Sequence, residues 1–503
     1  MSELSHEKAV QEIPQKGFFG HPRGLGVLYT VEFWERFSYY GMRALLIYYI
    51  YYIYYNVSQG GLGLEKTFAQ SLIAVYGSLI FMTSILGGWV ADRILGTRRS
   101  MFYGAVLIII GHICLSLPFG LTGLLSSMFF IIVGSGLMKP NISNIVGRLY
   151  PKDDSRVDSG FVIFYMAVNM GAFVSPLVLD HFRNVGNFHG GFLIAAIGMG
   201  LSLLFYLLFH KRNLGRIGVA PPNPLSPAEK KKYGMIFGLI TAVIVLVVAI
   251  ASMTGTLSFN LVSLIVLVLG FALPFVYFTI MIVSKDTTDV ERSRVIAFIP
   301  LFIVGVIFWS IQEQGANVLA VYADEKADLA FNLFGWESVF PVTWFQSINP
   351  FFIVVFAPVI SWLWRRLGRF EPSLPIKFAI GLFLAGSSFI LMMGVIYAYN
   401  DANIWFVWII LSYIICVIGE LCISPTGNSS AVKLAPENFN SQMMSLWLLT
   451  NATAQAINAQ LVKLQPIIGN QNYFGLIGGI AIVVALLAVI GSPFILRAMK
   501  GIR

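Results

Sequence analysis

The feature that most constrains this chain is a succession of long apolar segments separated by short polar ones. Of its 503 residues, 57% are hydrophobic and 11% are charged, whereas soluble proteins carry about 25% charged residues. A helix that spans a bilayer needs about 20 mostly apolar residues, and its backbone groups must be hydrogen-bonded internally. The sequence therefore predicts an all-α polytopic membrane protein. The fourteen candidate spans are 24–55, 67–92, 101–118, 122–147, 159–181, 190–210, 234–252, 261–284, 295–321, 341–364, 376–398, 404–432, 441–464 and 472–496.

The longest polar linker, 211–233, separates the first six spans from the other eight. It is rich in proline and contains the basic run Lys230–Lys232. The next two spans, 234–252 and 261–284, carry no charged residue. We predict that they form a lipid-facing hairpin inserted between two six-helix halves, which gives twelve core helices plus two. A single fourteen-helix core is the alternative.

This interpretation divides the chain into five units. They are a cytoplasmic N-terminus (1–23), an N-terminal six-helix bundle (24–210), a basic cytoplasmic linker (211–233), an inserted transmembrane hairpin (234–284) and a C-terminal six-helix bundle (285–503).

Basic residues set the expected orientation, because Lys and Arg gather on the cytoplasmic side of membrane proteins. If both termini are inside, 4 of the 33 Lys and Arg residues face outward, three lie within spans, and all others are cytoplasmic. The net charge of +9 is then explained by this asymmetry and does not indicate a nucleic-acid partner. We expect a multi-pass protein of the cell membrane (plasma or inner membrane) with cytoplasmic N- and C-termini.

Seven Glu, Lys and Arg residues stand out well inside the predicted spans, where a charge costs several kcal/mol unless it is paired or hydrated. They are Glu32, Glu35, Arg36, Arg43, Lys139, Glu313 and Glu420. The four on the first span recur at helical spacing and share one face, which must line a polar interior. Three cations against four carboxylates leave one negative charge in excess. A carboxylate without a permanent partner in a low-dielectric interior is able to take up a proton, which is the minimum requirement for proton coupling.

Charged groups of both signs, interleaved with aromatic residues, favour a ligand with two charged ends and a variable apolar body. The aromatic candidates are Tyr39, Tyr40, Tyr76, Trp309 and Trp447. A set of static interhelical ion pairs is the purely structural alternative. The sequence contains no recognisable nucleophile–base pair, metal-ligand set or phosphate-binding loop. We therefore expect neither an enzyme nor a metal or organic cofactor, with protons as the coupling ion.

Five motifs resemble those of the proton-dependent oligopeptide transporter family (POT, also called PTR) of the major facilitator superfamily. They are Glu32-x-x-Glu35-Arg36, the loop motif 88–99, and the segments 136–141, 164–171 and 419–425. The loop motif is common to the superfamily, whereas the combination is specific to peptide transporters. The resemblance extends over nearly the whole chain and implies a major facilitator fold. Bacterial members resemble this chain in having twelve core helices plus two.

The resemblance also implies roles for individual residues in binding a peptide. The carboxylate of the peptide would face Arg36, Arg43 and Lys139. Its amino end would be held by Glu420, Asn169 and Asn349. The five aromatic residues named above would line side-chain pockets, and Ser424 would belong to the same peptide-binding set.

Proton coupling is assigned by the same resemblance. Glu32 and Glu35 would take part in it together with Arg36 and Lys139. Glu313 would pair with Arg43 as a proton-sensitive gate. At position 312 the chain departs from the pattern, because Gln312 stands where some relatives have a second acid.

The predicted function is proton-coupled import of di- and tripeptides by alternating access, with peptide-like antibiotics as further candidate cargo. We expect a monomer embedded in the lipid bilayer. One alternative is a major facilitator importer of a non-peptide anion, which would leave Glu420 without an amine to bind. The other is a proton-coupled drug exporter, which needs a carboxylate but no cations that match a ligand carboxylate.

Overall fold

The computed structural model describes residues 3–51, 61–151, 154, 156–256, 258–333 and 335–502. Fourteen helices in this part of the chain are 20 or more residues long. Each overlaps one of the predicted spans; residues 52–55, at the end of the first predicted span, lie outside the described residues. The predicted number and order of the long helices are confirmed.

The first part of the chain contains a short N-terminal helix and eight long ones. These helices are α1 (Glu3–Gln11), α2 (Arg23–Tyr51), α3 (Lys66–Val90), α4 (Thr97–Ser116), α5 (Gly120–Gly147), α6 (Val157–Asn184), α7 (Phe188–Leu214), α8 (Pro227–Met253) and α9 (Phe259–Val283). A π-helical turn, η2 (Ala91–Leu95), extends α3.

The second part contains six long helices, shorter helical pieces and four short strands. The helices are α10 (Asp289–Gln314), η3 (Gly315–Leu319), α11 (Ala320–Lys326), η4 (Val342–Trp344), α12 (Phe345–Leu367), η5 (Gly368–Phe370), α13 (Leu374–Ala398), α14 (Phe406–Lys433), η6 (Glu437–Phe439), α15 (Asn440–Leu461), α16 (Gln465–Ile468) and α17 (Asn470–Ala498). The strands are β1 (Ala327–Asp328), β2 (Ala330–Leu333), β3 (Trp336–Val339) and β4 (Ile404–Trp405).

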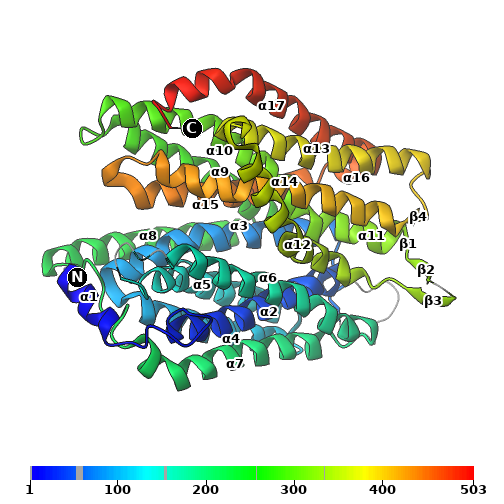
Figure 1. Cartoon of the computed structure of the whole chain (residues 1–503). Coiled ribbons are helices and arrows are strands. Elements are labelled where there is room, and N and C mark those ends of the chain that lie inside the picture. Colours follow the sequence, from blue (N-terminus) through cyan, green and yellow to red (C-terminus); the bar gives the residue numbers. More distant parts are fainter. Residues whose placement is uncertain are drawn as a thin grey trace.

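The long helices form two layers in Figure 1, with α2 to α7 in the lower layer and α10 and α13 to α17 in the upper one. Between the layers α3 packs against α15, and α12 packs against both α6 and α14. Both chain termini lie at one end of the molecule, which we call the termini end. The opposite end carries the antiparallel pair β2–β3 and the parallel pair β1–β4, and we call it the hairpin end.

The helix pair α8–α9 contacts both layers. α9 packs along α15, where Thr453 donates a hydrogen bond to the carbonyl of Gly270 at 2.7 Å, and it also contacts α3. α8 is joined to the lower layer near its start, where Glu229 pairs with Arg93 at 2.5 Å. Most of its large apolar side chains are exposed beyond this point. Such a surface suits contact with lipid.

Eleven of the long helices, judged over the described residues, are long and apolar enough to cross a membrane. The other three are α2, α8 and α15. α2 carries four of the predicted buried charges, and α15 carries the amides Asn451, Gln455 and Asn458. α2 contacts η3 of the upper layer, and α15 contacts α3 of the lower layer. The polar side chains of both helices need polar partners at this interface between the layers.

The helix that carries Glu313 changes its winding directly after this residue. α10 ends at Gln314, and the next five residues, Gly315–Leu319, form a π-helical turn that continues into α11. Tyr413 of α14 donates a hydrogen bond to the carbonyl of Gly315 at 2.6 Å. π-helical turns inside helices frequently mark functional sites. The turn therefore indicates that the segment around Glu313 is a candidate functional region.

α3 and α5 cross with their backbones in contact. A Cβ atom on Gly87 would lie 1.9 Å from the carbonyl oxygen of Gly136, a distance that no side chain can occupy. Asn141 of α5 also donates a hydrogen bond to the carbonyl of Gly87 at 3.3 Å. This crossing fixes α5 against α3 and places Lys139 beside the lower layer's polar face.

The glycine contact predicts different effects for two neighbouring substitutions. Gly87→Ala should destabilise the protein by about 1–3 kcal/mol, the usual cost of overpacking. Gly88→Ala should be neutral or slightly stabilising, because no atom of the described residues lies within 4 Å of a Cβ atom at this position and Ala favours a helix. Thermal unfolding of both variants in detergent measures the difference. Equal melting temperatures would contradict the tight crossing.

Candidate functional site

The first half of α2 carries a compact ion cluster. Arg36 Nε lies 2.6 Å from Oε1 of Glu32 and 3.2 Å from Oε2 of Glu35, and both carboxylates are buried. Arg36 donates a hydrogen bond to Glu32. Within the described residues, neither oxygen of Glu35 accepts a hydrogen bond. Glu35 is therefore the least satisfied member of the polar face that the sequence predicts.

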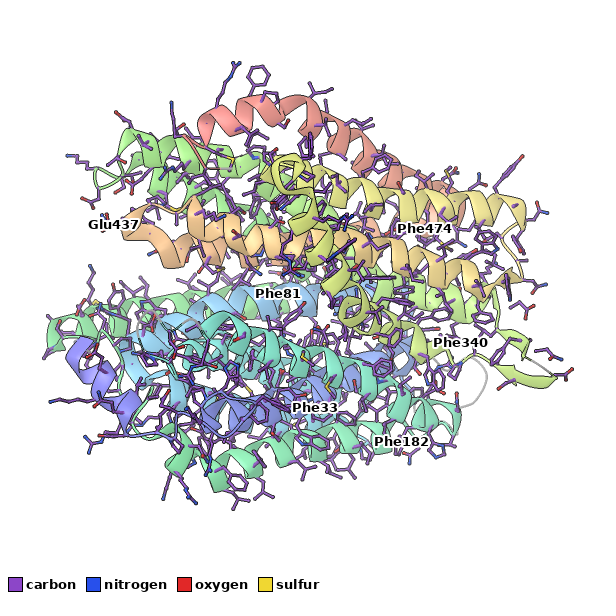
Figure 2. All side chains as sticks on the ribbon, in the orientation of Figure 1. Phe33, Phe81, Phe182, Phe340, Glu437 and Phe474 are labelled. Atoms are coloured by element: carbon purple, nitrogen blue, oxygen red, sulfur yellow. The ribbon has the colours of Figure 1, made fainter. Side chains whose placement is uncertain are left out.

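Lys139 reaches this face from α5 and rests on aromatic rings. Its Nζ lies 4.2 Å from the ring centroid of Tyr39 and 5.5 Å from that of Phe81. Figure 2 shows Phe81 on α3, between the two helix layers. Lys139 forms no ion pair with a carboxylate of the described chain, and cation–π contacts compensate an ammonium only in part. Its positive charge is available to an anion.

A second ion pair joins the two layers. Arg43 of α2 and Glu313 of α10 are 2.5 Å apart, Nη2 to Oε2, and their side chains are 12% and 11% exposed. Glu313 accepts two more hydrogen bonds from α15, from Gln455 Nε2 at 2.7 Å and from Asn451 Nδ2 at 3.1 Å. The predicted Arg43–Glu313 pair is present, with both carboxylate oxygens hydrogen-bonded.

Glu420 of α14 is held by neutral side chains. Its Oε2 accepts hydrogen bonds from Asn349 of α12 at 2.8 Å and from Gln312 of α10 at 2.7 Å. Cys416, one turn earlier on α14, donates to Oε1 of Gln312 at 2.9 Å and so orients the amide. No cation in the described part of the chain pairs with Glu420. Its carboxylate has hydrogen bonds but no counter-ion.

The aromatic candidates differ in burial. Tyr39, Tyr76 and Trp447 are buried, whereas Tyr40 and Trp309 are partly buried. The rings of Tyr39 and Tyr40 are 5.2 Å apart in an edge-to-face arrangement. The hydroxyl of Tyr76 has no hydrogen-bond partner among the described residues. Such a hydroxyl is able to bond to a ligand.

Two polar candidates form no hydrogen bond with Glu420 in the described part of the chain. Asn169 donates a hydrogen bond to the carbonyl of Tyr165, in its own helix α6, at 3.0 Å. Ser424, one turn after Glu420 on α14, is partly buried. Asn169 therefore does not share the hydrogen bonds that Asn349 makes.

Sequence reasoning missed Asn451, Gln455 and Cys416, all of which contact the site. The two amides lie four residues apart on a helix that is predicted to span the membrane, which is a recognisable signal. Their contact with Glu313 depends on the rotation of α15 against α10, which the sequence does not show.

The two layers are tied together at the hairpin end. Arg183 of α6 forms an ion pair with Asp324 of α11, and Tyr51 of α2 donates a hydrogen bond to the same carboxylate at 2.7 Å. Lys66 of α3 pairs with Glu325 at 2.7 Å. Two consecutive acidic residues of α11, which continues α10 of the upper layer, thus contact three helices of the lower layer.

A further tie lies close by, where Thr343 of η4 donates a hydrogen bond to Asp180 of α6 at 2.5 Å. Ser347 of α12 donates to the carbonyl of Phe173 at 2.8 Å. These contacts close the molecule at the hairpin end.

Comparison with known proteins identifies the family. The sequence model of the POT family matches residues 98–473. The chain is 40% identical to a di-/tripeptide transporter of Lactococcus lactis, covering 97% of this chain and 99% of the relative. The chain belongs to the POT family. It is also 48% identical to an uncharacterized transporter, YclF, of Bacillus subtilis over the full length of both proteins.

Solved structures of POT transporters have the same fold. A POT family transporter in complex with a thioalcohol conjugated peptide is 63% identical, with a TM-score of 0.94 and 97% and 99% of the two chains covered. A structure with the same identity, TM-score and coverage contains 5-aminolevulinic acid. The major facilitator fold is thereby confirmed, and this POT-family chain is a membrane transporter rather than an enzyme. Its described residues contain no group of three or more side chains arranged to hold a metal ion.

The closure at the hairpin end of this POT transporter can be tested by a double-mutant cycle on Arg183 and Asp324. Both side chains are 12% exposed, so removing one partner breaks a largely buried ion pair, at a cost of about 3–5 kcal/mol. We expect Arg183→Ala and Asp324→Ala each to lower thermal stability in detergent, and the double variant to cost less than their sum.

The neighbouring pair supplies the control. The side chains of Lys66 and Glu325 are 38% and 36% exposed, so Lys66→Ala should change stability by at most about 1 kcal/mol. Additive effects of the two substitutions in the cycle would show that Arg183 and Asp324 act independently.

Proposed function

We propose that this POT-family transporter is a symporter that imports di- and tripeptides together with protons. The observation that carries the proposal is that two charged groups of the site have no ion-pair partner among the described residues. In the part of the chain that the structure describes, Lys139 of the lower layer has aromatic contacts but no ion pair with a carboxylate, and Glu420 of the upper layer has amide partners but no ion pair with a cation. A zwitterionic peptide supplies the missing partner for each. The names of the relatives, di-/tripeptide transporters among them, support this cargo.

The carboxylate of the peptide binds among Arg36, Arg43 and Lys139. Its amine binds Glu420, assisted by Asn349 and, after a change of side-chain rotamer, by Asn169. The complex of a relative with 5-aminolevulinic acid supports recognition of the two charged ends, because that ligand also has an amine and a carboxylate. Peptide-like antibiotics would bind by the same two ends.

The body of the peptide lies between these ends. Tyr39, Tyr40, Tyr76, Trp309 and Trp447 line the pockets for its side chains, and Ser424 contributes a hydroxyl. Aromatic walls accept side chains of many shapes, since every apolar group gains from contact with them. Binding strength then depends mainly on the ends, which all short peptides share.

Proton coupling follows from competition for the cations. Arg36 is shared by Glu32 and Glu35, and a peptide carboxylate that approaches Arg36 or Lys139 weakens that pairing. A carboxylate displaced from its cation takes up a proton. When the peptide carboxylate reaches Arg43, it displaces Glu313 from this cation, and Glu313 then takes up a proton as well. Protons are the coupling ion, and no metal or organic cofactor is required.

Transport proceeds by rocking of the two bundles, 24–210 and 285–503, about this site. The hairpin 234–284 is an insert, connected through the basic linker 211–233. The distribution of Lys and Arg supports cytoplasmic termini, with segment 1–23 inside, so the hairpin end faces outward. We place the protein in the cell membrane as a monomer.

Two other functions make different demands on the site. The ligand of a non-peptide anion importer has no amine, so such a transporter does not need Glu420 and its amide partners. A proton-coupled drug exporter needs a carboxylate but no cations that match a ligand carboxylate, so it does not need Lys139 beside Arg36. Both features are present, which favours the peptide.

The proposed function predicts gradient-driven uptake. Purified protein in proteoliposomes should accumulate labelled dialanine when the outside is acidic, and much less without a gradient. Empty liposomes under the same gradient are the control. Uptake of a monovalent anion, with no gradient-stimulated uptake of dialanine, would overturn the peptide assignment.

The assignment of Glu313 as a gate predicts that gradient-driven accumulation and exchange respond differently to its substitution. Glu313→Gln removes the charge that pairs with Arg43, so we expect loss of gradient-driven accumulation, while exchange of labelled for unlabelled dialanine continues. Accumulation and counterflow are measured in the same proteoliposome preparation. Unchanged accumulation would contradict the assignment of Glu313 as the proton-sensitive gate.

A further inference from the structure

The Arg43–Glu313 ion pair is embedded in a larger hydrogen-bond cluster. The carboxylate of Glu313 accepts one hydrogen bond from Arg43 and two from amides of α15, Gln455 and Asn451. The two amides stand one helical turn apart on the same face of α15. Neither amide has a role in the transport mechanism proposed above.

The three partners of Glu313 belong to different layers. Arg43 lies on α2 in the lower layer, whereas Asn451 and Gln455 lie in the upper layer together with Glu313. α10 and α15 are also joined by Asn458, whose Oδ1 accepts a hydrogen bond from Ser310 at 2.6 Å. A movement of one layer against the other therefore separates Glu313 from Arg43 but not from the two amides.

An amide can form hydrogen bonds with Glu313 in both of its protonation states, as a donor to the carboxylate and as an acceptor from the protonated carboxyl group. A guanidinium is only a donor, so it pairs best with the ionised carboxylate. Arg has donors only, while Asn and Gln each have a donor and an acceptor. In the described residues, Oδ1 of Asn451 is buried and has no hydrogen-bond partner. A rotation of this amide turns the acceptor toward Glu313, where it accepts the hydrogen of a protonated carboxyl group.

Gln455 is confined by the opposite layer. A Cβ atom on Gly77 of α3 would lie 2.8 Å from Gln455 Nε2, so the amide fills the space that this glycine leaves. The next residue, Ser78, donates a hydrogen bond to the carbonyl of Ala452 at 2.8 Å. In this arrangement of the layers, the contact between α3 and α15 holds Gln455 against Glu313.

We propose that Asn451 and Gln455 form an amide cradle for Glu313. The cradle directs the ionised carboxylate toward Arg43, and it keeps the carboxyl group hydrogen-bonded after the proton has been taken up and Arg43 has left. The opening of the gate then does not leave Glu313 as an unpaired polar group in the membrane interior, which would be costly. Both amides are positioning residues, and the inference rests on the proposed proton-coupled transport.

The test uses variants of the full-length protein in proteoliposomes. Gln455→Met and Asn451→Leu keep the approximate volume of each side chain and remove the amide. Gln460→Met is the matched control, since Gln460 lies on the same helix and its amide donates to Ser263 of α9 at 3.1 Å. For each variant we measure gradient-driven accumulation of dialanine, its KM, and counterflow exchange.

We expect the accumulation rate of Gln455→Met and Asn451→Leu to fall roughly tenfold, which corresponds to about 1.4 kcal/mol. The KM should change by less than about twofold, because neither amide is needed to bind the peptide. Persisting exchange shows that a variant is folded. Gln460→Met should match the wild type in all three measurements.

Wild-type accumulation by both variants would overturn the cradle and leave the proposed function intact. A fall in exchange as large as the fall in accumulation would also overturn it, because it would indicate a general structural defect. If the wild type itself does not respond to the proton gradient, the proposed function is wrong, and the cradle is wrong with it.

Discussion

An ionised group inside a bilayer has no water to solvate it, so a neighbouring side chain or the cargo has to compensate its charge. Two cations of the candidate site are compensated by carboxylates of the protein, Arg36 by Glu32 and Arg43 by Glu313. Lys139 and Glu420 have no ion-pair partner among the described residues, and they lie in different layers. The site is therefore complementary to a zwitterion before any ligand enters, and a ligand that satisfies both charges draws the layers together.

The energies involved indicate why proton and cargo would have to act together. Shifting a two-state equilibrium from 1:99 to 99:1 requires about 5.5 kcal/mol. Loss of one buried ion pair contributes about 3–5 kcal/mol. Release of Arg43 from Glu313 is then insufficient alone, since the pair Arg183–Asp324 also holds the hairpin end closed. Two linked events are needed, and binding of a peptide beside the same cations supplies the second.

The fold was largely predictable because the bilayer fixes the length and polarity of each span, both of which can be read along the chain. The buried charges were recognisable in the sequence because each interrupts an otherwise apolar span. The orientation of neutral side chains could not be predicted in this way. Asn451 and Gln455 carry no charge, and their partner depends on the rotation of α15. Asn169 was expected beside Glu420, but its amide bonds within its own helix. The family resemblance supplied roles for residues; it did not supply these contacts.

The two carboxylates of the upper layer illustrate how the position of a partner determines what an acid can do. The hydrogen-bond partners of Glu420, Asn349 and Gln312, lie on helices of the C-terminal part of the chain, as Glu420 does. Its geometry therefore persists while the layers move, as a binding group requires. Glu313 has its cationic partner in the other layer, so its environment changes with every movement. A carboxylate in that position senses the conformation and is able to control it, because the free energy of its pairing with Arg43 is present in one state and absent in the other.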